Sequence, residues 1–270
     1  MINDSNTYQA VRVGDVADWR LICVISSRRM CAYLKHTDPT RDLEVLFDES
    51  WRDDSSSLLS RIENLVYDHP QVLDDFSADI IIVAPHTIWV PTSMVEDDEE
   101  QIDTLFNRVY EAEPQDISAS EVDDATALFS LIPGLNAFLQ RTFPGARIHS
   151  HLAVMAQRFR DRSCDMTRVY IDVRDNEADF VAFDHRNLLM GATHTWHDPA
   201  DIQYHLFNIM NVYNLDPRTT QVSLSGIRDI KNQLIDELRK QLDFVMLTML
   251  PTLSTKVAMP LAGALMLRRD

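Results

Sequence analysis

The apolar and polar positions of this chain follow one order of elements, and that order occurs twice. The clearer copy begins at Arg168, where three apolar and β-branched segments joined by tight polar turns predict three consecutive strands. Asp198 is a good cap for the following helix, because a carboxylate there accepts the free amide hydrogens of the first turn. The predicted elements are strands 168–174, 178–184 and 188–195, helix 199–213, strand 221–224, helix 229–241, strand 244–247 and an apolar segment 260–267.

The first half predicts the same order with an addition. Three strands are followed by a helix that starts behind three serines and ends before Pro70. Residues 79–84 are apolar without interruption, which is typical of a strand buried on both faces of a sheet. The predicted elements are strands 19–26, 30–35 and 43–47, helix 58–69, strand 79–84, an apolar piece 87–95 split by Pro91, helix 96–110, strands 115–121 and 125–131, helix 133–142, strand 147–149 and helix 151–160.

This repeated order predicts an α/β protein with two ribonuclease H-like lobes, each a mixed sheet flanked by helices in the order βββαβαβα. We place the first lobe in residues 1–163, with an acidic helix and strand insertion at about 96–131, and the second lobe in residues 164–270. The polar, charged stretch 161–165 is the predicted joint. The repeat is one of pattern, because the two halves share few identical residues.

Charge is distributed unevenly along the chain, whose formal net charge is −17. Residues 1–163 carry 14 Lys and Arg against 28 Asp and Glu, whereas residues 164–270 carry 11 against 14. Such a chain is repelled by nucleic acid phosphates and by anionic membrane surfaces, so we expect neither as a partner. The acidity has two interpretations: a solubilising surface, or a docking face for a basic protein.

Features of membrane or secreted proteins are missing from the sequence. No apolar run approaches the about 18 residues that span a bilayer, and the polar start MINDSNTYQAVRVGD is unlike a signal peptide. We therefore expect a cytoplasmic protein without membrane insertion. Its cysteines, Cys23, Cys31 and Cys164, are expected to be free thiols, with Cys23 and Cys31 on neighbouring strands where they could face each other.

Two copies of this element order resemble the actin-like ATPase superfamily, which is built from two ribonuclease H-like domains. The segment VYIDVRDNEADFVAFDHRNLLMGATHTW is similar to the phosphate-loop hairpin of the pilus-assembly and secretion scaffolds in that superfamily. VSLSGIRDIKNQL is similar to the segment that approaches the adenosine. IIIVAPHTIWVPTSMVEDDEEQIDTLFN resembles a family of uncharacterised bacterial proteins assigned this duplicated fold, and the resemblance covers about residues 19–250.

The resemblance implies a nucleotide site in which Asp172 holds magnesium and Ser225 and Gly226 flank the adenosine. The turn after Asp172, residues 173–177, has two carboxylates and no glycine, although glycine is what lets backbone N–H groups close around phosphates. The matching turn of the first half, residues 25–29, has neither glycine nor Asp. We therefore interpret Asp172, Ser225 and Gly226 as a vestigial nucleotide cleft and expect no cofactor.

Other motifs assign no chemistry. His149 and His151 form HxH, and His194 and His197 form HxxH, but a metal site needs three or four converging ligands, so we expect no metal. Phosphate-loop, dinucleotide-binding and nucleophile-elbow motifs are missing from the sequence, so no catalytic residue is assigned. Three further residues are candidate interface anchors, namely Trp51, Trp89 and Trp196.

The sequence thus favours a non-catalytic actin-like scaffold or adaptor that binds a protein partner. The partner would be a basic protein or a second copy of this chain. The expected partner-binding residues are Trp89 and the acidic run Glu96, Asp97, Asp98, Glu99 and Glu100. The alternative is an ATP-dependent enzyme of the same superfamily, an ATPase or a sugar-kinase-like phosphotransferase, with ATP and magnesium at Asp172.

Overall fold

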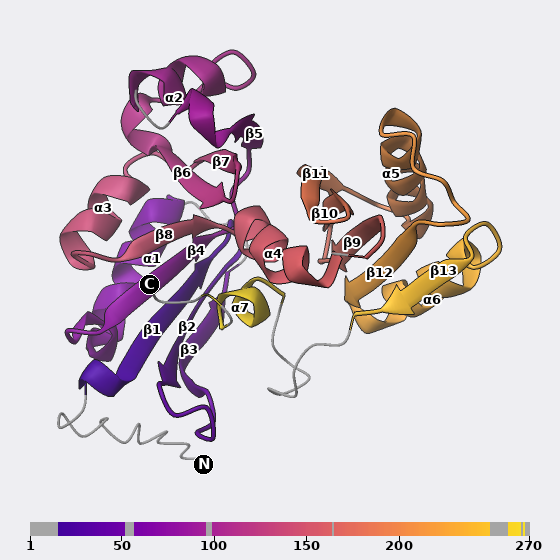
Figure 1. The fold of residues 1–270 in the computed structure, drawn as a ribbon. Coiled ribbons are helices and arrows are strands. Elements are labelled where there is room, and N and C mark those ends of the chain that lie inside the picture. The colour runs from indigo at the N-terminus through magenta and orange to yellow at the C-terminus, as the bar shows by residue number, and fades with distance from the viewer. Residues whose placement is uncertain are drawn as a thin grey trace.

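The fold consists of two lobes of the same design, seen side by side in Figure 1. The structure is a computed structural model that describes residues 16–51, 57–95, 99–163, 165–248, 259–265 and 267. The first lobe contains β1 (Trp19–Ile25), β2 (Arg29–His36), β3 (Glu44–Ser50), α1 (Leu58–Asp68), β4 (Ser77–Ile82), α3 (Leu135–Thr142), β8 (Arg147–Ser150) and α4 (His151–Arg160). The second contains β9 (Arg168–Val173), β10 (Glu177–Asp184), β11 (Asn187–Thr195), α5 (Pro199–Val212), β12 (Gln221–Gly226), α6 (Arg228–Leu238), β13 (Phe244–Leu247) and α7 (Met259–Ala264).

Corresponding strands occupy corresponding places in the two sheets. The orders are β3-β2-β1-β4-β8 and β11-β10-β9-β12-β13. In each sheet the first three strands are antiparallel neighbours, and the fourth and fifth join in parallel. The predicted fold class and its order of elements are therefore confirmed.

Local sequence explains where the helices begin. Ser57 caps α1, because its hydroxyl accepts the amide hydrogen of Ser60. Asp198 caps α5 as predicted, and Asp201 completes a capping box by accepting from the backbone N–H of Asp198. α3 begins at Leu135, two residues later than predicted, because Gly134 adopts a left-handed conformation and donates its amide hydrogen to Asp116.

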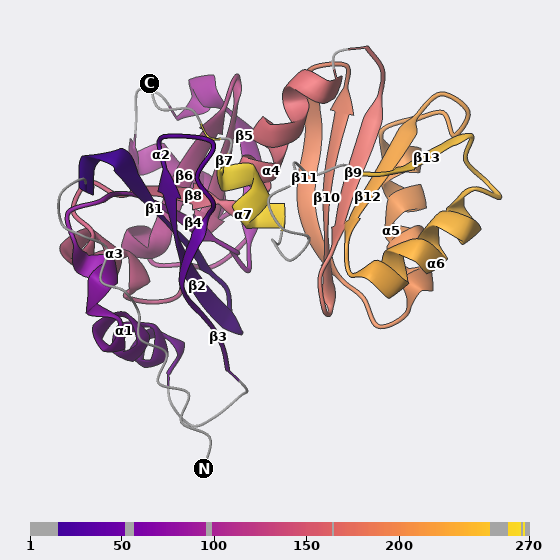
Figure 2. The same ribbon diagram turned by 90° about the horizontal axis from the view of Figure 1, so that it is seen from below.

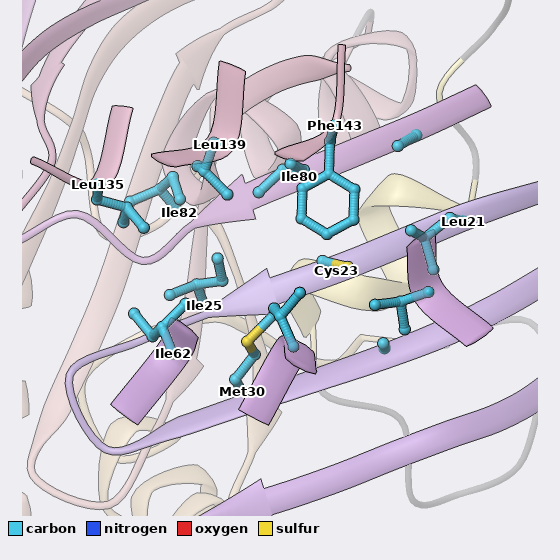
Figure 3. Packing of buried hydrophobic residues seen from close by; sticks show 14 of the residues in the cluster. Leu21, Cys23, Ile25, Met30, Ile62, Ile80, Ile82, Leu135, Leu139 and Phe143 are labelled. Atoms are coloured by element: carbon cyan, nitrogen blue, oxygen red, sulfur yellow. The ribbon is translucent and has the colours of Figure 1, made fainter. Parts of the chain in front are cut away.

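The core of the first lobe lies between its sheet and the helices α1 and α3 on one face. Figure 3 shows Ile62 of α1 and Leu135 and Leu139 of α3 packed over side chains of β1, β2 and β4. The second lobe repeats this arrangement with α5 and α6 on one face of its sheet (Figure 2). Burial of these apolar faces is the main stabilising contribution to each lobe.

Two helices join the lobes across the opposite sheet faces. α4 of the first lobe packs Leu152, Met155 and Phe159 against β9 and β10 of the second lobe. α7 packs Leu261 and Ala264 on β1 and β4, so α7, assigned to the second lobe from the sequence, lies against the first lobe. The two helices approach closely at Gly263, where a Cβ atom would lie 2.5 Å from a methyl group of Val154.

Buried ion pairs reinforce this crossing. Arg20 of β1 donates to the carbonyl oxygens of Ala264 and Leu267 at the end of α7. Its Nε atom lies 3.3 Å from Asp79 of β4, which also accepts from Arg147 and contacts His149. A cation near a helix C-terminus is favourable. Through these contacts, Arg20 connects the first sheet with the C-terminal end of α7.

The insertion in the first lobe forms a small sheet of its own. Its strands are β5 (Thr87–Pro91), β6 (Ile117–Val122) and β7 (Ala125–Ser130) in the order β5-β7-β6, accompanied by α2 (Glu99–Phe106). The inserted unit therefore begins near Thr87, earlier than the predicted 96. α2 ends at Phe106 rather than at Tyr110, and residues 107–110 continue as hydrogen-bonded turns.

The placement of the cysteines differs from the prediction in one respect. Cys23 and Cys31 are free thiols on opposite faces of the first sheet, because Val24 rather than Cys23 pairs with Cys31. The predicted facing of Cys23 and Cys31 is therefore wrong, and Cys164 lies outside the described residues.

Within the described part of the chain, none of the helices is both long and apolar enough to cross a membrane.

Candidate functional site

Asp172 and Ser225 meet at the carboxyl ends of two parallel strands of the second lobe. β9 carries Asp172 and β12 carries Ser225, and the two residues are direct neighbours in the ladder. The Ser225 hydroxyl donates to Asp172 Oδ1 at 2.7 Å, and both side chains are buried. The carboxyl ends of parallel strands are where α/β sheets usually receive ligands, so the structure brings two of the three predicted cleft residues together in a suitable place.

A second buried carboxylate, Asp179 of β10, lies beside Asp172 and is held from both lobes. Arg174 donates to its two oxygens at 2.8 Å each. The hydroxyl of Thr193 in β11 donates to Asp179 Oδ1 at 2.7 Å, and His151 Nε2, at the start of α4, lies 3.2 Å from the same oxygen. Nothing in the sequence pattern indicated this four-residue network, because Thr193 and His151 are 14 and 28 residues from Asp179 in the chain.

The two carboxylates differ in their protonation. Burial, reinforced by the charge of Asp179, raises the pKa of Asp172 to about 6. Burial alone would also raise the pKa of Asp179, but His151 and Arg174 hold it well below its ordinary value. The pair therefore combines one firmly ionised carboxylate with one that accepts a proton near neutral pH.

Gly226, the third predicted cleft residue, sits where the backbone of β12 touches β9. Its φ angle is +96°, and a Cβ atom there would lie 2.0 Å from the carbonyl oxygen of Val173. Ile227 donates its amide hydrogen to that same oxygen at 2.9 Å. β12 therefore extends through Ser225 and Gly226, two residues beyond the predicted strand 221–224, and glycine is required by this close contact.

A tryptophan closes the first hairpin turn of each lobe in the same way. Trp51 follows β3 and donates its amide hydrogen to Arg28 O and its indole hydrogen to Ser27 O, both at 2.9 Å. Trp196 follows β11 and donates the same two hydrogens to Asn176 O and Arg174 O, both at 3.0 Å. These residues were predicted as candidate interface anchors, and the structure places both indole N–H groups on the turns of their own lobes.

The turns themselves are also closed internally. The amide hydrogen of Ser26 is donated to Arg29 O, and that of Arg174 to Glu177 O, both at 2.8 Å. Arg174 turns its guanidinium inward to Asp179 and to Glu177, whose carboxylate lies 2.7 Å away. In each lobe, polar groups of the first hairpin turn are thus hydrogen-bonded to the chain itself.

The predicted partner-binding residues lie elsewhere, in the insertion. Trp89 of β5 is half-buried and donates its indole hydrogen to Gly191 O of β11 at 2.9 Å, so it joins the insertion to the second lobe. Glu99 and Glu100 begin α2, but their side chains are outside the described part of the structure, as are Glu96, Asp97 and Asp98 entirely.

The histidine motifs do not converge. His149 contacts Asp79 and His151 contacts Asp179, whereas His194 stacks on His205 with ring centroids 4.2 Å apart. Among the described residues, no group of three His, Cys, Asp or Glu side chains could hold a metal ion.

Replacing Asp172 by asparagine should stabilise the protein at pH 8. The raised pKa means that folding favours protonated Asp172, so this contribution is fully present below about pH 4 and is lost as pH rises through about 6. Asparagine removes the charge and keeps an oxygen that can accept from Ser225. Urea unfolding of D172N should therefore give a gain of up to about 3 kcal/mol at pH 8, which shrinks toward pH 5.

The control for this experiment is D175N, because Asp175 is an exposed carboxylate in the adjacent turn. That variant should show a small effect without the same pH dependence. Lower stability of D172N at pH 8 would mean that the folded protein uses the ionised carboxylate.

Comparison with solved structures identifies the fold in which this site lies. A Bacteroides thetaiotaomicron protein with an actin-like ATPase fold and unknown function is similar, with a TM-score of 0.77 and 18% sequence identity over 89% of this chain and 94% of that one. The PilM–PilN type IV pilus biogenesis complex also contains a similar chain, with a TM-score of 0.53 and 11% identity over 85% of this chain and 88% of that one. Identities this low show a shared fold alone.

The fold is therefore the actin-like ATPase fold, as the sequence pattern predicted. No curated protein matched the sequence. The sequence profile of the family described as protein of unknown function (DUF3822) matches residues 31–243, which is more than half of the chain. By this match, the chain belongs to the DUF3822 family.

Proposed function

We propose that this protein is a non-catalytic scaffold or adaptor whose actin-like frame binds a protein partner. The observation that carries the proposal is that polar groups at the predicted nucleotide cleft form hydrogen bonds with one another. Asp172 is hydrogen-bonded to Ser225, and Arg174 is hydrogen-bonded to Asp179. The first hairpin turn of each lobe is hydrogen-bonded to a tryptophan of the same lobe. A nucleotide would have to break these contacts and place its phosphates beside the carboxylates of Asp175 and Glu177.

Calorimetry with ATP and magnesium tests this proposal on the full chain. We expect no binding tighter than about 1 mM, because these turns lack the glycines that let backbone N–H groups close around phosphates, and a triphosphate there meets like charge. Binding tighter than about 0.1 mM would instead favour the alternative, an ATPase or phosphotransferase with Asp172 near magnesium. In that case D172N should weaken ATP binding, whereas D175N should not.

A protein partner is the second part of the proposal. The acidic excess of residues 1–163 supports a basic partner, and the complex of PilM with PilN is a precedent for a protein bound to a chain of similar fold. We assign the contact to the acidic run Glu96, Asp97, Asp98, Glu99 and Glu100, and to Trp89, which joins the insertion to the second lobe. We further propose that the protein acts in the cytoplasm and binds neither nucleic acid nor membrane.

Neutralising the acidic run tests this assignment. Replacing all five residues by serine or glutamine should reduce recovery of a crosslinked partner from the native host severalfold, and added salt should weaken wild-type recovery because exposed charges are screened. Quantitative mass spectrometry of the crosslinked material measures both effects.

A matched control removes five exposed carboxylates elsewhere on the first lobe, at Asp42, Glu44, Glu49, Asp74 and Asp75. This variant should recover the partner as the wild type does. Equal recovery by both variants would mean that Glu96 to Glu100 form only a solvated helix start.

A further inference from the structure

Beyond its first turn, α5 carries no charged side chain. Residues 202–215 contain no Asp, Glu, Lys or Arg, although charged residues make up 25% of the chain. Asp198 and Asp201, at the start of the helix, are used in its capping box. The one histidine of this run, His205, stacks on His194 of β11 with ring centroids 4.2 Å apart. The exposed surface of the helix is therefore built from uncharged side chains.

Three of these side chains form a line along the exposed face of α5. Tyr204, Asn208 and Val212 are spaced four residues apart, so they lie above one another on the helix, and all three are exposed. Tyr204 is 68% exposed and Val212 is 62% exposed, which places them among the most exposed large hydrophobic side chains of the described residues. We call Tyr204, Asn208 and Val212 the α5 stripe.

The neighbouring helix α6 has an exposed face of the opposite kind. α6 lies beside α5 on the same face of the second sheet (Figure 2). Its exposed side chains include Arg228, Asp229, Asp236, Arg239 and Lys240. Loss of charged residues together with enrichment in tyrosine distinguishes the centre of a protein interface from the rest of a surface. By this criterion α5, and not α6, has the composition of an interface.

The position of α5 favours a second copy of this chain as the occupant. α5 and α4 pack on opposite faces of the second sheet, so α5 faces away from the first lobe (Figure 2). Residues 1–163 hold 28 Asp and Glu against 14 Lys and Arg, so most of the net charge of −17 lies in the first lobe. Two copies of such a chain repel each other least where both surfaces are uncharged and distant from that lobe. A basic partner, in contrast, gains no attraction from a face without charge.

We propose that the α5 stripe binds the α5 stripe of a second copy, as an antiparallel helix pair around a two-fold axis. In such a contact the central residue faces its own counterpart. The spacing of the stripe puts Asn208 at the axis, with Tyr204 of each copy beside Val212 of the other. An asparagine amide has both donors and an acceptor, so two Asn208 side chains can bond each other, whereas a charged residue at the axis would meet like charge. This inference does not rest on the proposed scaffold function.

Sedimentation equilibrium of the full chain tests the proposal. One helix face is a small interface, so we expect a monomer–dimer equilibrium with a Kd of about 1 to 100 µM. Raising sodium chloride from about 0.05 to about 0.5 M should tighten the dimer, because salt screens the repulsion between two negative molecules. Capture of the basic partner in the proposed function should respond to salt in the opposite direction, so failure of one proposal is distinguishable from failure of the other.

Charge placed at the axis supplies the decisive variants. Asn208→Asp and Asn208→Lys should each weaken the dimer about tenfold or more, because like charges then face each other across the axis. An equimolar mixture of the two variants should form heterodimers with an affinity near that of the wild type, because opposite charges then meet. Asn232→Asp, the matched control, makes the same change at an exposed position of α6 and should dimerise as the wild type does.

Four results would each overturn the proposal. They are a wild type that stays monomeric at about 0.5 mM, Asn208→Asp dimerising as the wild type does, equal weakening by Asn232→Asp, and a mixture of the Asp and Lys variants that forms no heterodimer. Circular dichroism checks that each variant is folded. If Asn208→Asp does not fold, Tyr204→Ser decides, because it removes exposed aromatic surface from the stripe and should also weaken the dimer about tenfold.

Discussion

Replacing Gly226 by alanine should lower the free energy of unfolding by about 4 kcal/mol or more, which is among the largest effects of a single substitution. Alanine resists the φ of +96° at this position, and its Cβ atom would lie 2.0 Å from Val173 O and 2.5 Å from Val173 N. Both atoms belong to the central strand β9, so neither can move without disturbing the sheet. Urea unfolding followed by circular dichroism measures the change.

Gly145→Ala is the matched control for this substitution. Gly145 has a similar φ of +78°, but a Cβ atom there would have no neighbour within 4 Å. Its cost should be about 1 kcal/mol, from the backbone conformation alone. Equal effects of G226A and G145A would show that β12 and β9 are less tightly joined than the structure indicates, and that the vestigial cleft is open at this point.

The contrast between these glycines shows what the sequence could predict. Strand and helix periods, together with caps such as Ser57 and Asp198, predicted both lobes because they depend on residues close in the chain. Ser225 and Gly226 look like the turn after a strand when they are considered locally. Only their pairing with Asp172 and Val173, more than 50 residues earlier, makes them part of β12.

The same limit applies to the tryptophans. Trp51 and Trp196 occupy equivalent positions after the third strand of each lobe, and each donates two hydrogen bonds to the first hairpin turn. The equivalent positions of the two tryptophans can be recognised in the sequence when the two halves are aligned by their strands. What could not be predicted was the direction of the indole N–H groups, because that direction depends on how the turn folds back over the sheet. The hydrogen bond of Trp89 was harder still to predict, because its acceptor, the carbonyl oxygen of Gly191, belongs to the other lobe.

These long-range contacts involve the residues of the second lobe that resemble a nucleotide site in sequence. The Ile-Asp-Val strand and the Ser-Gly dipeptide are in the expected places. Asp172, however, accepts from Ser225 and Asp179 from Arg174, and the turn 173–177 contains no glycine. These features support the proposed scaffold function over the alternative of an ATP-dependent enzyme.

Replacing Arg174 by glutamine should lower the free energy of unfolding by about 3 to 5 kcal/mol at pH 7, because it leaves the buried carboxylate of Asp179 without its main counter-ion. The Arg174 side chain is 21% exposed and that of Asp179 only 2%, so solvent cannot replace the lost hydrogen bonds. Asp172, buried beside Asp179, adds like charge. Urea unfolding at pH 7 and pH 5 measures the effect, which should be smaller at pH 5, because Asp179 without its guanidinium can take up a proton there.

Arg29→Gln provides the comparison in the first lobe. Arg29 also holds a carboxylate, that of Asp48, but the two side chains are 45% and 36% exposed, and surface pairs of this kind contribute at most about 1 kcal/mol. The double variant R174Q/D179N should recover much of the stability lost in R174Q, since it removes the unpaired charge. If R174Q proved as mild as R29Q, water would have to reach the carboxylates of the second lobe, and this result would count against the proposed scaffold function.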